Sequence, residues 1–185
     1  MKKISICASL FILVSCAYEP ADELTIYTSR QPQLIEPIVE KFSLETGIKV
    51  NFLSGNAQEL MERIDVEGDS SPADIFMTVD AGVLWQAAER DIFSSTNSKI
   101  LEENIPPYLR DPENKWFGLS KRARTIVYSN DQFNDNDFST YEDLADPKWK
   151  GKLCLRTSKK VYNRSLMASM IDAYGFEKAK EVVRG

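Results

Sequence analysis

The chain has 185 residues, which is enough for one domain, or for one domain and part of a second. Its 23 Lys and Arg against 28 Asp and Glu give a net charge of −5, and 43% of the residues are hydrophobic. These values exclude disordered, collagen-like and coiled-coil chains and argue against a nucleic-acid-binding protein. The chain has no histidine, which excludes histidine triads, haem sites with a histidine ligand and the usual zinc sites. Its three cysteines are too scattered for a metal site made of cysteines alone.

The first 15 residues have the pattern of a secretory signal peptide. A basic start precedes an apolar stretch at residues 4–14, which is shorter than the ~20 residues that a membrane-spanning helix needs. Leu-Val-Ser-Cys at residues 13–16 resembles the bacterial lipoprotein signal, in which the cysteine is lipidated and becomes the first mature residue. We therefore expect a signal peptide at 1–15, a tether at 16–23 and a periplasmic protein held to a membrane by a lipid on Cys16. A plain signal peptide with an incidental cysteine is the alternative.

Strand and helix patterns alternate over the first hundred residues. Apolar residues predict strands at 23–28, 48–53 and 73–79, each followed by a stretch with helical spacing. Gly47 is expected to end the first helix and Asn56 to cap the second, and we expect Asp80 to cap the third rather than to bind a ligand. This order predicts an α/β fold with a parallel sheet covered by helices.

The carboxyl ends of these three strands predict a ligand-binding crevice, because ligands of open α/β sheets bind at that edge. Each strand end passes directly into a helix start, and helix N-termini suit an anion or an oxygen-rich ligand. Arg30 and Gln31, which follow the first strand, are candidate ligand contacts.

The pattern changes after residue 97. It predicts strands at 116–128 and 152–156 and a helix at 165–183. We expect Trp85, Trp116 and Trp149 to pack in the interior. Cys154 is the one thiol left after signal cleavage, and we expect it to be buried and unreactive.

Four stretches, at residues 71–82, 116–124, 139–151 and 161–166, resemble the ferric-iron-binding proteins of bacterial ABC importers. The stretch 139–151 is the longest and the most specific of them. The resemblance implies a two-lobed periplasmic-binding-protein fold of the class II type that closes over Fe(III). It also implies a monomeric receptor, not an enzyme, that delivers iron to an inner-membrane permease and its ATPase. We expect a first lobe at 24–115 and a hinge strand with an incomplete second lobe at 116–185, within a longer protein.

The resemblance also implies the site residues. The tyrosine of the family's Tyr-Asn-x-Ser-Leu motif, here Tyr162, is expected to bind iron as phenolate. An arginine of the Lys-Arg-Ala-Arg motif, here Arg122, is expected near the metal, with carbonate or another anion as a co-ligand. The tandem tyrosines that supply two further ligands in the family would lie beyond residue 185. Many relatives carry a His-Tyr pair where this chain has Gln31 and Pro32. The site therefore uses second-lobe tyrosines with water or an anion, or its cargo is not bare iron.

Other functions stay open at this point. A receptor for an oxyanion, an organic acid or an iron chelate would use the same helix starts, and a purely structural lipoprotein is a further alternative. An enzyme is disfavoured because the chain lacks histidine, a Gly-x-Ser-x-Gly turn and paired carboxylates at strand ends. We also expect the 185-residue chain alone to aggregate or to bind iron weakly, because unpaired sheet edges and apolar helix faces would be exposed.

Overall fold

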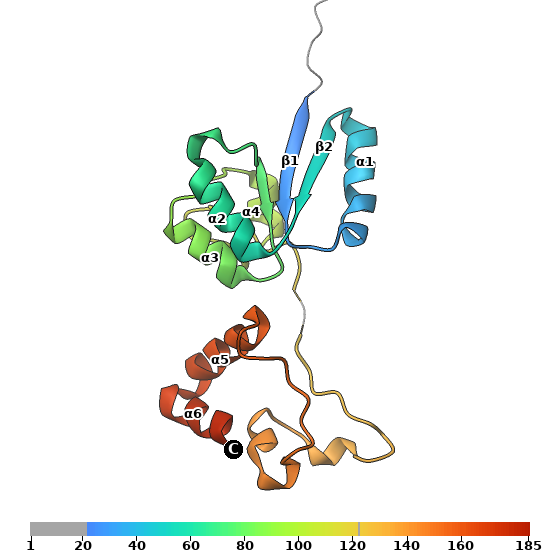
Figure 1. The fold of residues 1–185 in the computed structure, drawn as a ribbon, viewed down its shortest axis with the longest axis vertical. Helices are drawn as coiled ribbons and strands as arrows, with labels where there is room; N and C mark the ends of the chain where they lie inside the picture. Colours follow the sequence, from blue (N-terminus) through green and yellow to red (C-terminus); the bar gives the residue numbers. More distant parts are fainter. Residues whose placement is uncertain (1–21, 122) are drawn as a thin grey trace, which may run out of the picture.

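The computed structural model describes residues 22–121 and 123–185 and contains two bodies of secondary structure (Figure 1). The N-terminal body comprises the elements from β1 to the 3-10 turn η3 (Pro107–Leu109), and the C-terminal body comprises those from η4 (Asp135–Asp137) to α6. The residues between them, where described, form neither helix nor strand from 119 to 128. No helix in the described ranges has the length and apolar character that a bilayer crossing requires.

A parallel sheet of three strands forms the centre of the N-terminal body. Its strands β1 (Glu23–Thr28), β2 (Lys49–Ser54) and β3 (Ile75–Met77) lie in the order β2-β1-β3. The middle strand β1 ends in three buried residues, so the sheet is packed most tightly at its carboxyl edge. The predicted parallel α/β sheet is confirmed. Strand β3 is two residues shorter at each end than the predicted 73–79. Just before it, Thr25 N donates to Asp74 Oδ2 at 2.8 Å and Asp74 N donates to Thr25 O at 2.9 Å.

Helices lie on both sides of the sheet. Figure 1 shows α1 (Glu36–Thr46) beside β2, with α2 (Ala57–Glu67) and α3 (Ala81–Glu89) on the other side. The apolar face of α2 packs against β1 through Tyr27, Leu60 and Ile64, and against α3 through Met61 and Val83. The remaining elements of this body are the 3-10 turns η1 (Pro32–Leu34) and η2 (Gly68–Ser70) and the helix α4 (Lys99–Asn104).

The predicted helix ends of the N-terminal body are confirmed. Gly47 follows α1 with φ 75°, a left-handed conformation that glycine adopts without the steric penalty of a Cβ. Asn56 accepts a hydrogen bond from Gln58 N at 2.9 Å and caps α2. Asp80 accepts one from Gly82 N at 2.8 Å and caps α3. Asn56 and Asp80 thus fix the positions at which α2 and α3 begin after their strands.

The strands predicted at 116–128 and 152–156 are wrong. Within the described residues, the first region shows only an isolated bridge between Arg110 and Phe117, and the second has no regular structure. A strand forms only when a neighbouring strand pairs with its backbone, and no described strand lies beside either segment. The apolar pattern of these segments is therefore not sufficient to make them strands here.

The C-terminal body consists of three 3-10 turns and two helices. The turns are η4, η5 (Glu142–Ala145) and η6 (Pro147–Trp149), and the helices are α5 (Val161–Tyr174) and α6 (Phe176–Arg184). Trp149 is buried and stacks on Phe138, with ring centroids 4.5 Å apart. The single helix predicted at 165–183 starts earlier and is divided at Gly175, which has φ 80° and ψ 161°.

Two burial predictions are wrong. Trp85 is 55% exposed, because the buried face of α3 is made by Val83, Ala87 and Ala88, and Trp85 points away from it. Cys154 is exposed, because the strand that would have buried it does not form.

Candidate functional site

The carboxyl edge of the sheet brings the predicted residues Arg30 and Gln31 together with the start of α3. Ser29 N donates to Met77 O at 2.9 Å, and Gly55 N donates to Thr28 O at 3.1 Å, so the three strand ends lie side by side. Arg30 is half-buried, and its backbone N–H donates to Thr28 Oγ1 at 3.0 Å. Gln31 is exposed, and its side-chain oxygen accepts from Gln33 Nε2 at 3.1 Å.

Two hydroxyl groups at this edge were not identified from the sequence. Ser29 Oγ and Thr78 Oγ1 are shielded from solvent, and neither has a hydrogen-bond partner within the described part of the chain. A buried hydroxyl without a partner is unfavourable, which makes these two oxygens suited to a bound ligand. Their only signal in the sequence is their position at the ends of β1 and β3.

Tyr162 is the second residue of α5 and is half-buried. Two arginines hold the start of this helix. Arg124 donates from Nη2 to Tyr162 O at 2.8 Å and from Nη1 to Asn163 Oδ1 at 3.2 Å. The guanidinium carbon of Arg156 lies 5.3 Å from the centroid of the Tyr162 ring, and Asn163 Nδ2 donates to Arg156 O. Of the two arginines in the Lys-Arg-Ala-Arg motif, Arg124 is thus in contact with the Tyr162 backbone, while Arg122 lies outside the described residues, as does Cys16.

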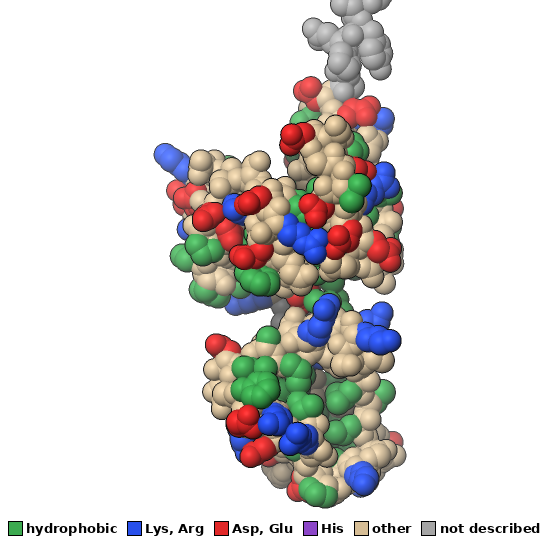
Figure 2. All heavy atoms as spheres, turned by 60° about the vertical axis from the view of Figure 1, so that its left-hand side comes forward, with side chains coloured by type: hydrophobic (Ala, Val, Ile, Leu, Met, Phe, Trp, Pro, Cys, Tyr) green, Lys and Arg blue, Asp and Glu red, His purple; other side chains and the backbone are tan. Residues whose placement is uncertain are grey.

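Positive charge gathers at the start of α5. Arg124, Arg156, Lys159 and Lys160 are all exposed there, and the first turn of the helix contains no acidic residue. Figure 2 shows Lys and Arg side chains at the end of the C-terminal body that faces the N-terminal body. The N-terminus of a helix carries partial positive charge of its own, so this end of α5 favours anionic ligands.

The two bodies are joined by contacts at this same place. Asp80 uses Oδ1 to cap α3, and its Oδ2 accepts a hydrogen bond from Ser165 Oγ at 2.8 Å. Val161, the first residue of α5, packs against the cluster of Met61, Val83 and Ala87. The first turn of α5 therefore lies against the carboxyl edge of the sheet.

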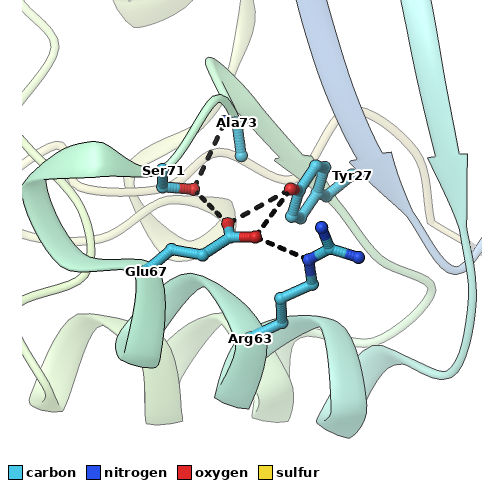
Figure 3. Close-up of polar contacts among 5 residues, drawn as sticks. All are labelled: Tyr27, Arg63, Glu67, Ser71 and Ala73. Atoms are coloured by element: carbon cyan, nitrogen blue, oxygen red, sulfur yellow. Dashed lines mark hydrogen bonds and ion pairs between the residues drawn. The ribbon is translucent and has the colours of Figure 1, made fainter.

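A second tyrosine near the sheet has a structural role. Tyr27 is 2% exposed, and its hydroxyl donates to both carboxylate oxygens of Glu67, at 3.1 and 3.2 Å (Figure 3). The same carboxylate accepts from Arg63 Nε at 2.6 Å and from Ser71 Oγ at 2.8 Å. Burial and the neighbouring carboxylate raise the pKa of Tyr27, and the hydrogen bond from Arg63 holds the pKa of Glu67 below its usual range. Tyr27 is thus kept neutral, which makes it unsuitable as a phenolate ligand.

Comparison with known proteins identifies the family of the chain. The profile of the family described as bacterial extracellular solute-binding proteins matches residues 27–181. Iron uptake protein A1 of Synechocystis sp. is 46% identical over 184 residues, which cover 94% of this chain and 51% of that protein. The Fe(3+)-binding periplasmic protein of Serratia marcescens is 27% identical over 174 residues, covering 93% of this chain and 51% of the relative. The chain thus spans about half the length of the curated relatives that it matches.

Solved structures agree with the sequence comparison. The ferric binding protein from Campylobacter jejuni superposes with a TM-score of 0.81 at 41% identity, over 86% of this chain and 51% of that one. The Trichodesmium protein IdiA (FutA), solved with iron and citrate ligands, gives a TM-score of 0.80 at 45% identity, over 87% of this chain and 51% of the other. These matches confirm the predicted α/β periplasmic-binding-protein fold for the part of it that the chain contains. The chain belongs to the family of bacterial extracellular solute-binding proteins.

Proposed function

We propose that the protein is an extracytoplasmic receptor that binds Fe(III) and delivers it to an ABC import permease and its ATPase. Its family consists of solute-binding proteins rather than enzymes. In this proposal residues 24–115 form the first lobe and residues 116–185 the hinge and part of the second, and the receptor acts as a monomer. The observation that supports it most is the position of Tyr162 in a turn of α5 that lies against the carboxyl edge of the sheet.

Tyr162 would bind Fe(III) as phenolate. Fe(III) is a hard cation and favours anionic oxygen, whereas a free tyrosine has a pKa of about 10 and is neutral at pH 7. A trivalent cation displaces the phenol proton, as metals do with other acidic ligands. The guanidinium of Arg156 lies 5.3 Å from the ring centroid and places a second positive charge beside the proposed metal ligand. Ser29, Arg30 and Gln31 would contribute contacts from the opposite side of the site.

An anion such as carbonate or citrate would bind together with the metal. Fe(III) held by one phenolate retains positive charge and open coordination positions. The exposed guanidinium groups of Arg124 and Arg156 at the start of α5 could bind a carboxylate or carbonate bidentately, and we assign the same role to Arg122. The Trichodesmium relative solved with iron and citrate supports a co-bound anion.

Membrane attachment through a lipid on Cys16 is part of the proposal. Metabolic labelling with a radioactive fatty acid tests it, because Cys16→Ala should abolish incorporation whereas Cys154→Ala should not. Incorporation that survives Cys16→Ala would contradict the anchor.

The decisive experiment is a titration of the full-length protein with Fe(III) followed by phenolate-to-iron charge-transfer absorbance. The parent should develop a visible band, and Tyr162→Phe should weaken it and bind iron at least about tenfold more weakly. Tyr174→Phe, on the same helix but 42% exposed, is the matched control and should behave like the parent. A parent without colour or affinity would refute the proposal.

A second candidate cargo is an iron chelate, an organic acid or an oxyanion. The cations at the start of α5 and the unpartnered hydroxyls of Ser29 and Thr78 favour it, because both suit an anionic ligand. Thermal unfolding with citrate or phosphate in metal-free buffer separates the two functions. An upward shift without iron favours the anion, and a shift that requires Fe(III) favours the metal.

A further inference from the structure

Asp80 and Ser165 form a side-chain hydrogen bond across the two bodies of the molecule. They lie 85 positions apart in the sequence, and Ser165 Oγ donates to Asp80 Oδ2 at 2.8 Å in a part-buried position. Asp80 also caps α3 through its other oxygen, at 2.8 Å from Gly82 N. The carboxylate is therefore held in place by its own helix, and its second oxygen faces the C-terminal body.

Ser165 lies one helical turn after Tyr162 on α5, so the two residues share a face of the helix. A contact that fixes Ser165 thus also fixes the distance of Tyr162 from the strand ends. Val161, which packs on Met61 and Val83, adds an apolar contact to the same junction. Outside this junction the bodies are connected through residues 119–121 and 123–128, which form neither helix nor strand.

We propose that the Asp80–Ser165 hydrogen bond holds the first turn of α5 against the sheet and thereby favours the arrangement of the two bodies in this structure over arrangements in which they lie further apart. Asp80 and Ser165 are then positioning residues, which act on a ligand through Tyr162. Together with the packing of Val161, this hydrogen bond is a contact between the bodies and contributes to the population of that arrangement. A hydrogen bond to a charged acceptor is strong enough to change such a population about tenfold.

Ser165→Ala is the sharpest test, because it removes the hydrogen bond and leaves the cap of α3 intact. Ser169→Ala is the matched control: Ser169 lies one turn further along the same helix and donates only to Ser165 O, within α5. Ser165→Thr keeps a hydroxyl and should restore the behaviour of the parent. Circular dichroism should show the same helix content in all three variants, which separates a lost hydrogen bond from a loss of folding.

The distance between the bodies is measured by pulsed electron spin resonance in metal-free buffer. One spin label is attached to the exposed Cys154 and the other to a cysteine introduced by Glu89→Cys, in a chain that also carries Cys7→Ser and Cys16→Ser. Ser165→Ala should shift the ratio of short to long distances about tenfold toward the long ones, and Ser169→Ala should leave it unchanged. Equal distributions in the parent and in Ser165→Ala would overturn the inference.

The inference does not require iron in order to be tested, and only its consequence for Tyr162 rests on the proposed function. If that function is right, Ser165→Ala should retain the charge-transfer band of the parent at saturating Fe(III) while the apparent Kd rises, because a smaller fraction of the molecules holds Tyr162 beside the strand ends. Tyr162→Phe, in contrast, should weaken the band itself. A distance shift without any iron binding would keep this inference and refute the proposed function.

Discussion

The phenol groups of Tyr27 and Tyr162 lie in different surroundings. An arginine lies over each ring, with Arg63 at 5.4 Å from the centroid of Tyr27 and Arg156 at 5.3 Å from that of Tyr162. The hydroxyl of the fully buried Tyr27 also donates a hydrogen bond to the carboxylate of Glu67. A buried phenol that donates to a carboxylate stays protonated, so a buried tyrosine near a binding site is not by itself evidence for a metal ligand.

Tyr27→Phe should lower the free energy of unfolding by about 1–2 kcal/mol, because it removes a hydrogen bond to a charged acceptor. The loss is limited because Glu67 keeps its hydrogen bonds from Arg63 and Ser71. Urea unfolding followed by tryptophan fluorescence measures the change. Tyr108→Phe, at a tyrosine that is 75% exposed, serves as the control and should have little effect. If Tyr27→Phe lowered the free energy of unfolding no more than the control does, the Tyr27–Glu67 hydrogen bond would not contribute to stability.

Glu67 predicts a pH dependence of stability on the acid side. Its pKa in the folded protein is held below the ordinary value of 4.5 by the hydrogen bond from Arg63. The stabilisation is therefore complete above about pH 4.5 and is lost as the pH falls through the lower folded pKa. The stability gap between the parent and Glu67→Gln should be constant near pH 7 and shrink below pH 4.5. The same comparison with Glu45→Gln, at an exposed residue of α1, provides the reference, and a gap that does not change with pH would contradict the assignment.

At the scale of elements, local signals determined the helix ends. Asn56 and Asp80 act within two residues of their own position, so their roles as caps are predictable from the sequence. The break between α5 and α6 could not be predicted from such local signals. The apolar spacing of the sequence continues across the break. The residue that marks it is Gly175, whose φ of 80° and ψ of 161° lie in a region that is essentially restricted to glycine.

Gly175→Ala should destabilise the protein by about 1–3 kcal/mol, because alanine would have to adopt that backbone conformation. The cost would come from the backbone alone, since a Cβ at this position meets no atom within 4 Å. Thermal unfolding followed by circular dichroism measures it, with Lys178→Ala on α6 as the control. If Gly175→Ala raised stability instead, α5 and α6 would have joined into the single helix that the spacing predicts.

The errors in the prediction arise where a residue depends on a distant partner. The strands predicted at 23–28 and 48–53 form, the second one residue later, because each pairs with the other in the sheet, as Ile26 does with Phe52. The run 152–156 also has an apolar centre, but no described strand lies beside it. The site residues also differ in whether a local pattern predicts them. Tyr162 was found from a motif, whereas the contact between Asp80 and Ser165 joins residues 85 positions apart, which no local pattern encodes.

At the scale of the whole molecule, apolar side chains remain on the surface of both bodies. Leu34 at the end of η1 and Ile38 in the first turn of α1 are 54% and 70% exposed. Phe176 and Val183 on α6 are 60% and 59% exposed, and Figure 2 shows hydrophobic side chains gathered on the surface of the C-terminal body. Adjacent exposed apolar residues of this kind promote association.

The 185-residue chain is therefore expected to self-associate when it is produced alone. Ile38→Glu should reduce association, because it places a charge in the exposed apolar surface of α1 without emptying the core. Gln33→Glu adds the same charge at a nearby exposed polar position and controls for the repulsion that extra negative charge causes. Sedimentation velocity over a range of protein concentrations measures both variants. If Ile38→Glu lowers the sedimentation coefficient and Gln33→Glu does not, the apolar surface of α1 drives association. A parent that sediments as a monomer at every concentration would show that the exposed side chains are too scattered to act as one surface.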